Sequence, residues 1–360
     1  MSSPVIHSLA AGRDHSLALM SHGEVWGWGA AGSGRADLPD VCSVAPPATP
    51  IVVPATRTFT QISAGYGTGY GVTADHEAFV WGFNRAGMGG RPDIVGTLQA
   101  EPMQGLGPVA QIAVAEFFGV ARRLDGTVVG WGLTRGGPQG ARNTGPLPVP
   151  LAGPAHHVAV GGGHVLALVE GALLAWGANA AGQLGQGHLN DLATPAQVSF
   201  PSATPAIQAA AAGASHNLAI DTEGRIWAWG SNQHGQLGQA QPAYSPRPLP
   251  VSVPEPVTAV AAGLYFSVAL GQSGQVYTWG WNAKGQLGRS PDYQDAEPTA
   301  VPGLHDIAHI AAGQAHVLAA RGTALYAWGD NQSNQLGPNG QPNRDPEHPG
   351  WSPAPVIALA

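Results

Sequence analysis

The sequence predicts an all-β fold built from seven similar units. The dipeptide Trp-Gly ends an apolar run in each unit, at Trp28, Trp81, Trp131, Trp176, Trp229, Trp279 and Trp328. Successive tryptophans of this set are 45 to 53 residues apart over the whole length, and no helical periodicity longer than a turn interrupts them. A regular period of this size is typical of repeat architectures. We therefore expect residues 1–360 to form one domain, a seven-bladed β-propeller with four short antiparallel strands per blade.

The fifth unit shows the predicted strands most clearly. Residues 206–213 and 216–220 predict two strands joined by a short turn, and Gly224 supplies the positive φ before a third strand at 225–230. The proline-bearing segment 246–251 predicts an edge strand, where lost N–H donors cost least. A lone four-stranded sheet cannot bury both of its faces. We therefore expect the seven sheets to pack radially, with a repeated tryptophan between neighbouring blades.

The two ends of the chain look like complementary parts of one unit. Residues 4–12 resemble the start of a unit, and residues 352–360 resemble the end of one. We therefore expect the N- and C-terminal strands to complete one blade and to close the ring. An open solenoid is disfavoured because it would need atypical polar units at both ends.

The composition excludes several classes of partner. The net charge is −7, Lys284 is the one lysine, and there is no basic tail, which argues against nucleic acid and anionic membranes as partners. Cys42 is the one cysteine, so the chain has no internal disulfide and fits a reducing compartment. No run of about eighteen apolar residues and no signal peptide is visible, so we expect a cytoplasmic protein.

Three stretches of the chain match a known repeat. Residues 10–19 read Ala-Ala-Gly-Arg-Asp-His-Ser-Leu-Ala-Leu, residues 274–280 read Gly-Gln-Val-Tyr-Thr-Trp-Gly, and residues 282–288 read Asn-Ala-Lys-Gly-Gln-Leu-Gly. This pattern resembles the regulator of chromosome condensation repeat family, in a bacterial-type seven-bladed form, and it extends over essentially the whole chain. The resemblance implies a propeller fold. It does not fix a function, because the family includes guanine-nucleotide exchange factors, a plant ultraviolet receptor and a β-lactamase inhibitor.

Two of these family functions are disfavoured by the residues. The family's chromatin-bound exchange factors rely on basic tails, which this chain lacks, so an exchange factor-like regulator remains only an alternative. The ultraviolet receptor uses tryptophans in a Gly-Trp-Arg-His-Thr stretch, which is absent here. The function that remains is protein binding, as in the inhibitor.

One face of the propeller carries the candidate binding residues. Because strands alternate in direction, the turn between the first two strands of each unit and the loop after Trp-Gly project from the same end, here called the first-turn face. Exposed aromatic side chains are typical interface anchors. The predicted partner-binding residues are Arg13, Tyr66, Glu116, Phe117, Phe118, Arg135, Tyr265, Phe266 and Gln314. An alternative for Phe118 and Phe266 is that they pack under the turn, since other units have histidine in that slot.

The repeated histidines are candidates for a catalytic or metal-binding role. His15, His164, His216 and His316 share one slot of the repeat, so we expect them to hydrogen-bond the backbone within each blade. No ligand spacing predicts a metal, and no cofactor is expected. The alternative to a scaffold is an enzyme or small-ligand binder with a site in the axial funnel, where Asp14, His15, Glu116 and His164 would be the acid–base groups. A further alternative is self-association through the first-turn face.

Overall fold

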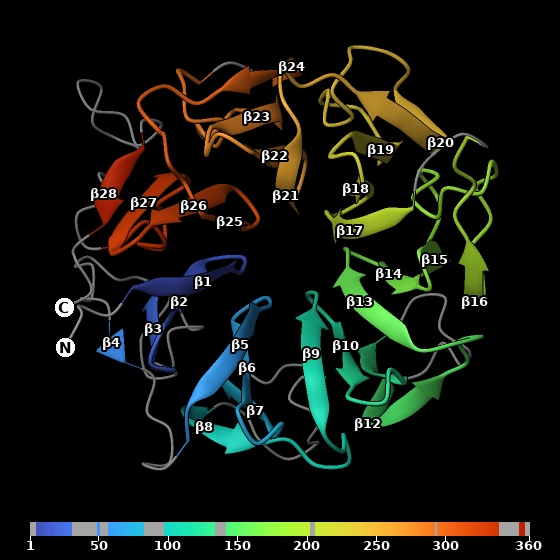
Figure 1. Cartoon of the computed structure of the whole chain (residues 1–360), viewed down its shortest axis with the longest axis vertical. Helices are drawn as coiled ribbons and strands as arrows, with labels where there is room; N and C mark the ends of the chain where they lie inside the picture. Colours follow the sequence, from blue (N-terminus) through green and yellow to red (C-terminus); the bar gives the residue numbers. More distant parts are fainter. Residues whose placement is uncertain are drawn as a thin grey trace.

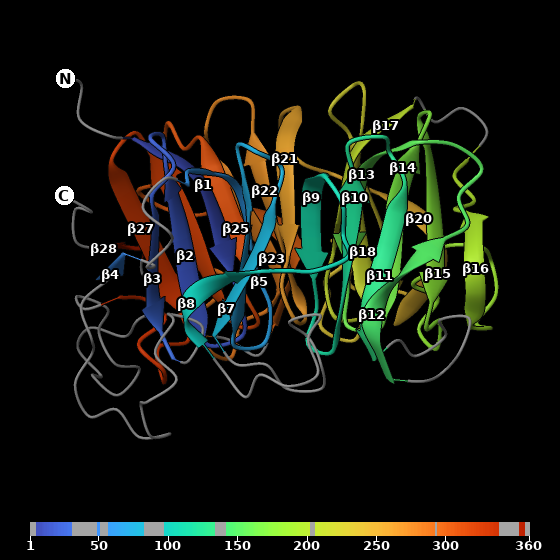
Figure 2. The same cartoon turned by 90° about the horizontal axis from the view of Figure 1, so that it is seen from below.

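Seven β-sheets form the whole of the described architecture. The computed structural model describes residues 5–30, 49–50, 57–82, 97–133, 142–201, 206–291, 294–337 and 353–356. These residues form 28 strands in seven four-stranded antiparallel sheets. The sheets stand side by side in a ring around a central axis (Figure 1), and the strands run roughly along that axis (Figure 2). The predicted seven-bladed propeller is confirmed.

Each blade consists of four strands that are consecutive in the sequence, with the first strand nearest the axis (Figure 1). Blade 1 contains β1 (Ile6–Ala11), β2 (His15–Met20), β3 (Val25–Gly29) and β4 (Thr49–Pro50). Blade 2 contains β5 (Phe59–Ala64), β6 (Thr68–Thr73), β7 (Ala78–Gly82) and β8 (Thr97–Pro102). Blade 3 contains β9 (Val109–Val114), β10 (Phe118–Arg123), β11 (Val128–Leu133) and β12 (Arg142–Val149).

The remaining blades repeat this order. Blade 4 contains β13 (Ala155–Val160), β14 (His164–Val169), β15 (Ala172–Gly177) and β16 (Leu192–Gln197). Blade 5 contains β17 (Ile207–Ala212), β18 (His216–Asp221), β19 (Ile226–Ser231) and β20 (Tyr244–Val251). Blade 6 contains β21 (Val257–Ala262), β22 (Phe266–Gly271), β23 (Val276–Trp281) and β24 (Gln294–Ala300). Blade 7 contains β25 (His309–Ala312), β26 (His316–Arg321), β27 (Ala324–Gly329) and β28 (Ala354–Val356). The strands of blade 5 agree with the four that the fifth unit predicts.

The ring closes by contact between blades 1 and 7 rather than through a shared blade. The Ile6 N–H donates to the Gly322 carbonyl at 2.9 Å, and the Gln314 N–H donates to the Gly12 carbonyl at 3.1 Å. The prediction of one blade completed by both ends is wrong. Each terminal segment finds its strand partners in its own unit, so β1 pairs with β2 and β28 pairs with β27.

The Trp-Gly pair needs glycine for two physical reasons. Gly230 has φ +101°, and a Cβ there would lie 2.4 Å from the Ser215 carbonyl oxygen. The next residue, Ser231, donates its N–H to that same carbonyl at 2.7 Å. The loop after Trp-Gly is therefore bonded to the first turn of its blade. This bond confirms that the two connections share one face of the propeller.

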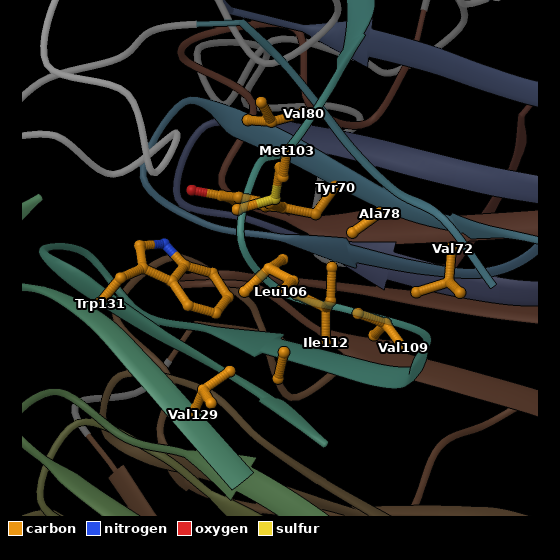
Figure 3. Packing of buried hydrophobic residues seen from close by; sticks show 11 residues of the cluster. Tyr70, Val72, Ala78, Val80, Met103, Leu106, Val109, Ile112, Val129 and Trp131 are labelled. Carbon is orange, nitrogen blue, oxygen red and sulfur yellow. The ribbon is translucent and has the colours of Figure 1, made fainter. Parts of the chain in front are cut away.

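The hydrophobic cores lie between blades, as the radial arrangement predicts. One cluster combines Tyr70 of blade 2 with Ile112 and Trp131 of blade 3, and Figure 3 shows these side chains facing one another. Trp131 is 1% exposed and Tyr70 is completely buried. The prediction that the repeated tryptophans lie between neighbouring blades is confirmed for the blades that these clusters join.

We expect Gly230→Ala to lower the melting temperature of the protein. A side chain at φ +101° costs about 1–2 kcal/mol, and the contact with the Ser215 carbonyl adds to this cost. The matched control is Gly145→Ala in β12, where an added Cβ meets nothing within 4 Å. Thermal unfolding followed by circular dichroism measures both variants. Equal melting temperatures for the two variants would contradict this account of the Trp-Gly pair.

Candidate functional site

The first-turn face surrounds the mouth of an axial channel of about 470 Å³. The innermost strands form the channel wall, and many of the side chains that line it are alanine. The predicted residues that lie together at the mouth are Arg13, Tyr66, Glu116 and Gln314. The structure therefore brings these four residues, from blades 1, 2, 3 and 7, to one rim.

Arg13 and Tyr66 form a contact across the junction of blades 1 and 2. The guanidinium carbon of Arg13 lies 4.2 Å from the centre of the Tyr66 ring. The Arg13 Nε atom is also 3.2 Å from the Asp14 carboxylate. Burial raises the pKa of Asp14, and the negative charge of Asp330 adds to the rise while Arg13 opposes it. This rim thus combines an aromatic face with two charges of opposite sign.

An aromatic triad, His234, Tyr265 and Trp281, lies on the same face at blades 5 and 6. The Tyr265 ring centre is 5.0 Å from that of His234 and 6.1 Å from that of Trp281. The His234 and Trp281 centres are 6.3 Å apart. All three side chains are partly exposed. Sequence reasoning found Tyr265 but missed its two partners, although His234 lies in the loop after Trp229-Gly230 and Trp281 directly follows Trp279-Gly280.

Phe117 is the most exposed of the predicted aromatic residues, with 41% of its surface accessible. It occupies the second position of the first turn in blade 3. The same position holds Gly163 in blade 4 and Ser215 in blade 5. The turn therefore forms without an aromatic side chain. Glu116, its neighbour, is half-buried at the channel mouth.

Two predicted residues do not belong to this surface. Phe118 is 3% exposed and Phe266 is fully buried, so neither side chain can touch a partner. Phe118 packs in one core cluster with Val165 of blade 4, and Phe266 packs in another with Val317 of blade 7. The prediction was wrong for both, and the alternative of packing under the turn is what the structure shows. Arg135 lies outside the described residues.

The repeated histidines are structural, but their partners differ from the expected ones. His15, His164, His216 and His316 are all completely buried. The Nε2 atom of His164 lies 2.6 Å from Asn217 Oδ1, and that of His216 lies 3.1 Å from Ser267 Oγ. These partners are side chains of the next blade, and His216 also interacts with the Phe266 backbone of that blade. Burial lowers the pKa to about 4 for His15 and His164, and to about 3 for His216 and His316.

The acid–base groups of the enzyme alternative are not brought together. His15 and His164 lie inside blade junctions and do not line the channel, and Asp14 does not line it either. Only Glu116 of that set reaches the channel mouth. In the part of the chain that the structure describes, no group of three or more His, Cys, Asp or Glu side chains has the geometry to hold a metal ion. Nor does any helix within these ranges have the length and apolar character needed to cross a membrane.

Sequence comparisons place most of the chain in one family. The family profile of the RCC1-like domain matches residues 108–359, and the regulator of chromosome condensation (RCC1) repeat profile matches residues 6–35. The ultraviolet-B receptor UVR8 of Arabidopsis thaliana is 28% identical over 242 residues, which cover 65% of this chain and 54% of UVR8. The mitochondrial RCC1 domain-containing protein RUG3 of the same plant is 31% identical over 264 residues, covering 65% of this chain and 55% of RUG3. The chain thus spans about half the length of these curated relatives.

Solved structures show the same fold. Prp20p of Saccharomyces cerevisiae, which was studied for its binding to Gsp1p and histones, superposes with a TM-score of 0.74 at 23% identity. The match covers 86% of this chain and 80% of Prp20p. The ectodomain of the Arabidopsis thaliana receptor kinase ACR4 superposes with a TM-score of 0.56 at 15% identity, covering 99% of each chain. At these identities the likeness shows the fold alone.

We expect the free energy of unfolding to fall as the pH is lowered from about 7 to about 5. The four repeated histidines have folded-state pKa values of about 4 or 3, against 6.5 for an ordinary histidine. The unfolded chain therefore binds protons in this window that the folded chain does not. For one group, a pKa that is lower by one in the folded state corresponds to about 1.4 kcal/mol. The raised pKa of Asp14 acts in the opposite sense, but it is one group against four.

Urea unfolding at the two pH values, followed by tryptophan fluorescence, measures this dependence. The midpoint should move to lower urea at the lower pH, with an unchanged slope. A midpoint that stays constant would show that the buried histidines do not control stability in this range.

Proposed function

We propose a protein-binding role for this chain, which belongs to the RCC1-like domain family. In this proposal residues 1–360 act as one propeller domain, and another protein is held on the first-turn face. The observation that carries the proposal is the set of accessible aromatic side chains on that face. These are Phe117 and Tyr66 together with the aromatic triad.

The fold does not account for these aromatic residues. Phe117 and Tyr265 stand at a turn position that is Gly163, Ser215 or Ala315 in other blades. Those blades form the same four-stranded sheets, so the aromatic rings are not needed for the turn. Large rings held partly exposed on a rigid support supply contact area at low cost in side-chain entropy, as interface anchors do.

The charged groups on the same face would orient the partner. Arg13 contacts both the Tyr66 ring and the Asp14 carboxylate, so its guanidinium already lies on this face before a partner arrives. Glu116 provides the opposite charge at the blade 3 side of the channel mouth. Charges of both signs at fixed places set the register of a complex more than its affinity.

The comparisons support a protein partner more than the other classes. Prp20p, whose fold this chain shares, was studied for its binding to Gsp1p and histones. The single lysine and the net charge of −7 do not favour nucleic acid. The channel volume of about 470 Å³ falls in the range of small-molecule pockets, which is the one observation that favours a ligand-binding role. Its wall is rich in alanine, and the polar side chains along it include Ser63, Gln111 and His157.

We expect the double variant Phe117→Ala/Tyr265→Ala to lose a partner protein that the wild type captures from the native cell lysate. Removing two anchor rings typically weakens an interface by about 2 kcal/mol or more, which is enough to lose capture after washing. The matched control is Leu124→Ala, which removes a 53% exposed apolar side chain from the turn between β10 and β11, on the opposite face.

Quantitative mass spectrometry of the captured proteins distinguishes the outcomes. A protein kept by the wild type and the Leu124→Ala variant but lost by the double variant supports the proposal. A small molecule that co-purifies with all three proteins, with no difference in captured protein, would move the assignment to a channel ligand. Sedimentation that changes with concentration for the wild type alone would identify a second copy of the chain as the partner.

A further inference from the structure

Hydrogen bonds connect blades 5 and 6 through four groups, here called a junction network. His216 of blade 5 donates from Nε2 to Ser267 Oγ of blade 6 at 3.1 Å. Ser267 Oγ in turn donates to the Gln236 carbonyl of blade 5 at 2.8 Å. Trp279 of blade 6 donates its indole N–H to the same carbonyl at 2.9 Å. Every member is buried, so the network satisfies polar groups that water does not reach.

Two further junctions contain the same network. At the junction of blades 4 and 5 the Gln183 carbonyl accepts from the side chains of Asn217 at 2.7 Å and Trp229 at 3.0 Å, and Asn217 bonds His164. At the junction of blades 7 and 1 the Gln335 carbonyl accepts from Ser16 at 2.8 Å and Trp28 at 3.0 Å. Ser16 Oγ also lies 2.9 Å from His316 Nε2. A histidine thus faces a polar side chain each time.

Two other junctions bring apolar side chains together in place of the histidine and its polar partner. Between blades 6 and 7 apolar Phe266 packs in one cluster with apolar Val317, and Trp328 still donates to the Gln286 carbonyl at 3.0 Å. Between blades 3 and 4 Phe118, Val165 and Trp176 form part of one apolar cluster. Polar groups face polar groups and apolar groups face apolar groups.

Between blades 2 and 3 a tyrosine takes the place of the glutamine carbonyl. The buried Tyr70 hydroxyl bonds the side chains of Thr68 and Trp131, and burial strongly raises the pKa of that hydroxyl. In Figure 3 the indole nitrogen of Trp131 and the Tyr70 hydroxyl lie on the same side of the cluster. The tryptophan N–H that lacks a glutamine carbonyl is therefore satisfied by another group.

The junction of blades 1 and 2 breaks this rule. His15 is buried there, but Gly69 stands at the strand position that is Ser267 in blade 6 and Asn217 in blade 5. Within the described residues, the Nε2 atom of His15 and the Nε1 atom of Trp81 are buried without a hydrogen-bond partner. The Nδ1 atoms of the other three repeated histidines also lack a hydrogen-bond partner. His15 therefore differs from them in that its Nε2 atom is unpaired as well.

The space next to Gly69 cannot accommodate a polar side chain like that of Ser267 or Asn217. A Cβ on Gly69 would lie 2.2 Å from the Trp81 Nε1 atom, so the indole itself fills the space above this strand. The junction is instead held by an apolar cluster that includes Leu17 and Phe59, and by the Arg13 N–H, which donates to the Gly65 carbonyl at 3.2 Å. The junction is thus packed, but it contains buried donors without acceptors.

We propose that the ring opens most readily at the junction of blades 1 and 2. A buried donor without an acceptor keeps its full desolvation cost in the closed state, and local opening lets water remove that cost. At the three junctions with complete networks, opening instead breaks several bonds. Opening between blades 1 and 2 exposes the apolar cluster of these blades and separates Arg13 from Tyr66 on the first-turn face. This inference goes beyond the proposed protein-binding role and does not depend on it.

Hydrogen exchange of the wild-type protein tests the proposal directly. Amides of β2 and β6 should exchange faster than those of β18 and β22, which occupy the same positions in blades 5 and 6. We expect at least a tenfold difference in exchange rate. Equal protection in the two pairs of strands, or weaker protection in β18 and β22, would overturn the proposal.

A matched pair of variants supplies a second, independent readout. Phe118 and Phe266 show that the histidine slot accepts a phenylalanine ring. His15→Phe removes a donor that has no acceptor, so the melting temperature should stay constant or rise and exchange in β2 and β6 should slow. His216→Phe removes the bond to Ser267 and should lower the melting temperature by a few degrees. An equal loss in both variants would overturn the proposal.

A tryptophan pair provides a check should a histidine variant fold poorly. Trp279→Phe loses the bond to the Gln236 carbonyl, whereas Trp81→Phe loses only ring volume. The melting temperature should therefore fall further for Trp279→Phe than for Trp81→Phe. The reverse order would count against the proposal.

Discussion

The hydrogen bond from a buried tryptophan to a glutamine carbonyl of the preceding blade is the interaction on which the regular part of the ring depends. Trp28, Trp229, Trp279 and Trp328 each make this bond, at 2.9 to 3.0 Å. The carbonyl is available because the loop that carries it folds on itself. In the loop of blade 5, for example, Asn232 Oδ1 accepts the Leu237 N–H at 2.8 Å. A loop on the surface thereby fixes an aromatic ring in the core of its neighbour.

This dependence explains how one loop sequence contributes both to stability and to the shape of the first-turn face. The loop after Trp-Gly lies on the first-turn face and is bonded to the first turn of its blade. His234 of the aromatic triad belongs to the loop of blade 5, and Trp281, which directly follows Trp279-Gly280, donates its N–H to the Tyr265 carbonyl at 2.9 Å. The aromatic triad is thus supported by blades 5 and 6, which a complete junction network joins, whereas Phe117, the most exposed ring, lies in blade 3.

The sequence was enough to predict the fold because the signal for it is local and repeated. Each Trp-Gly pair marks the end of one strand, and spacing alone then sets the number of blades. Ring closure was harder to predict, since the terminal segments resemble parts of a unit whether or not they share a blade. The burial of Phe118 and Phe266 could not be predicted with certainty from one repeat. Their partners, Val165 and Val317, lie about fifty residues further on, in the next repeat. Comparing the histidine slot of one unit with the following strand of the next unit would have revealed the matched pairs, and also the mismatch of His15 with Gly69.

The junction networks also limit how the blades can be rearranged. Each of blades 4 to 7 presents one half of a junction on each side. Toward the next blade it presents a histidine or phenylalanine with its loop carbonyl, and toward the previous blade it presents a strand side chain with its tryptophan. Blade 5 offers a polar half on both sides, whereas blade 7 offers an apolar half toward blade 6 and a polar half toward blade 1. The blades are therefore not freely interchangeable modules. Duplication, deletion or transfer of a blade preserves a sound ring only where the new neighbours present halves of the same polarity.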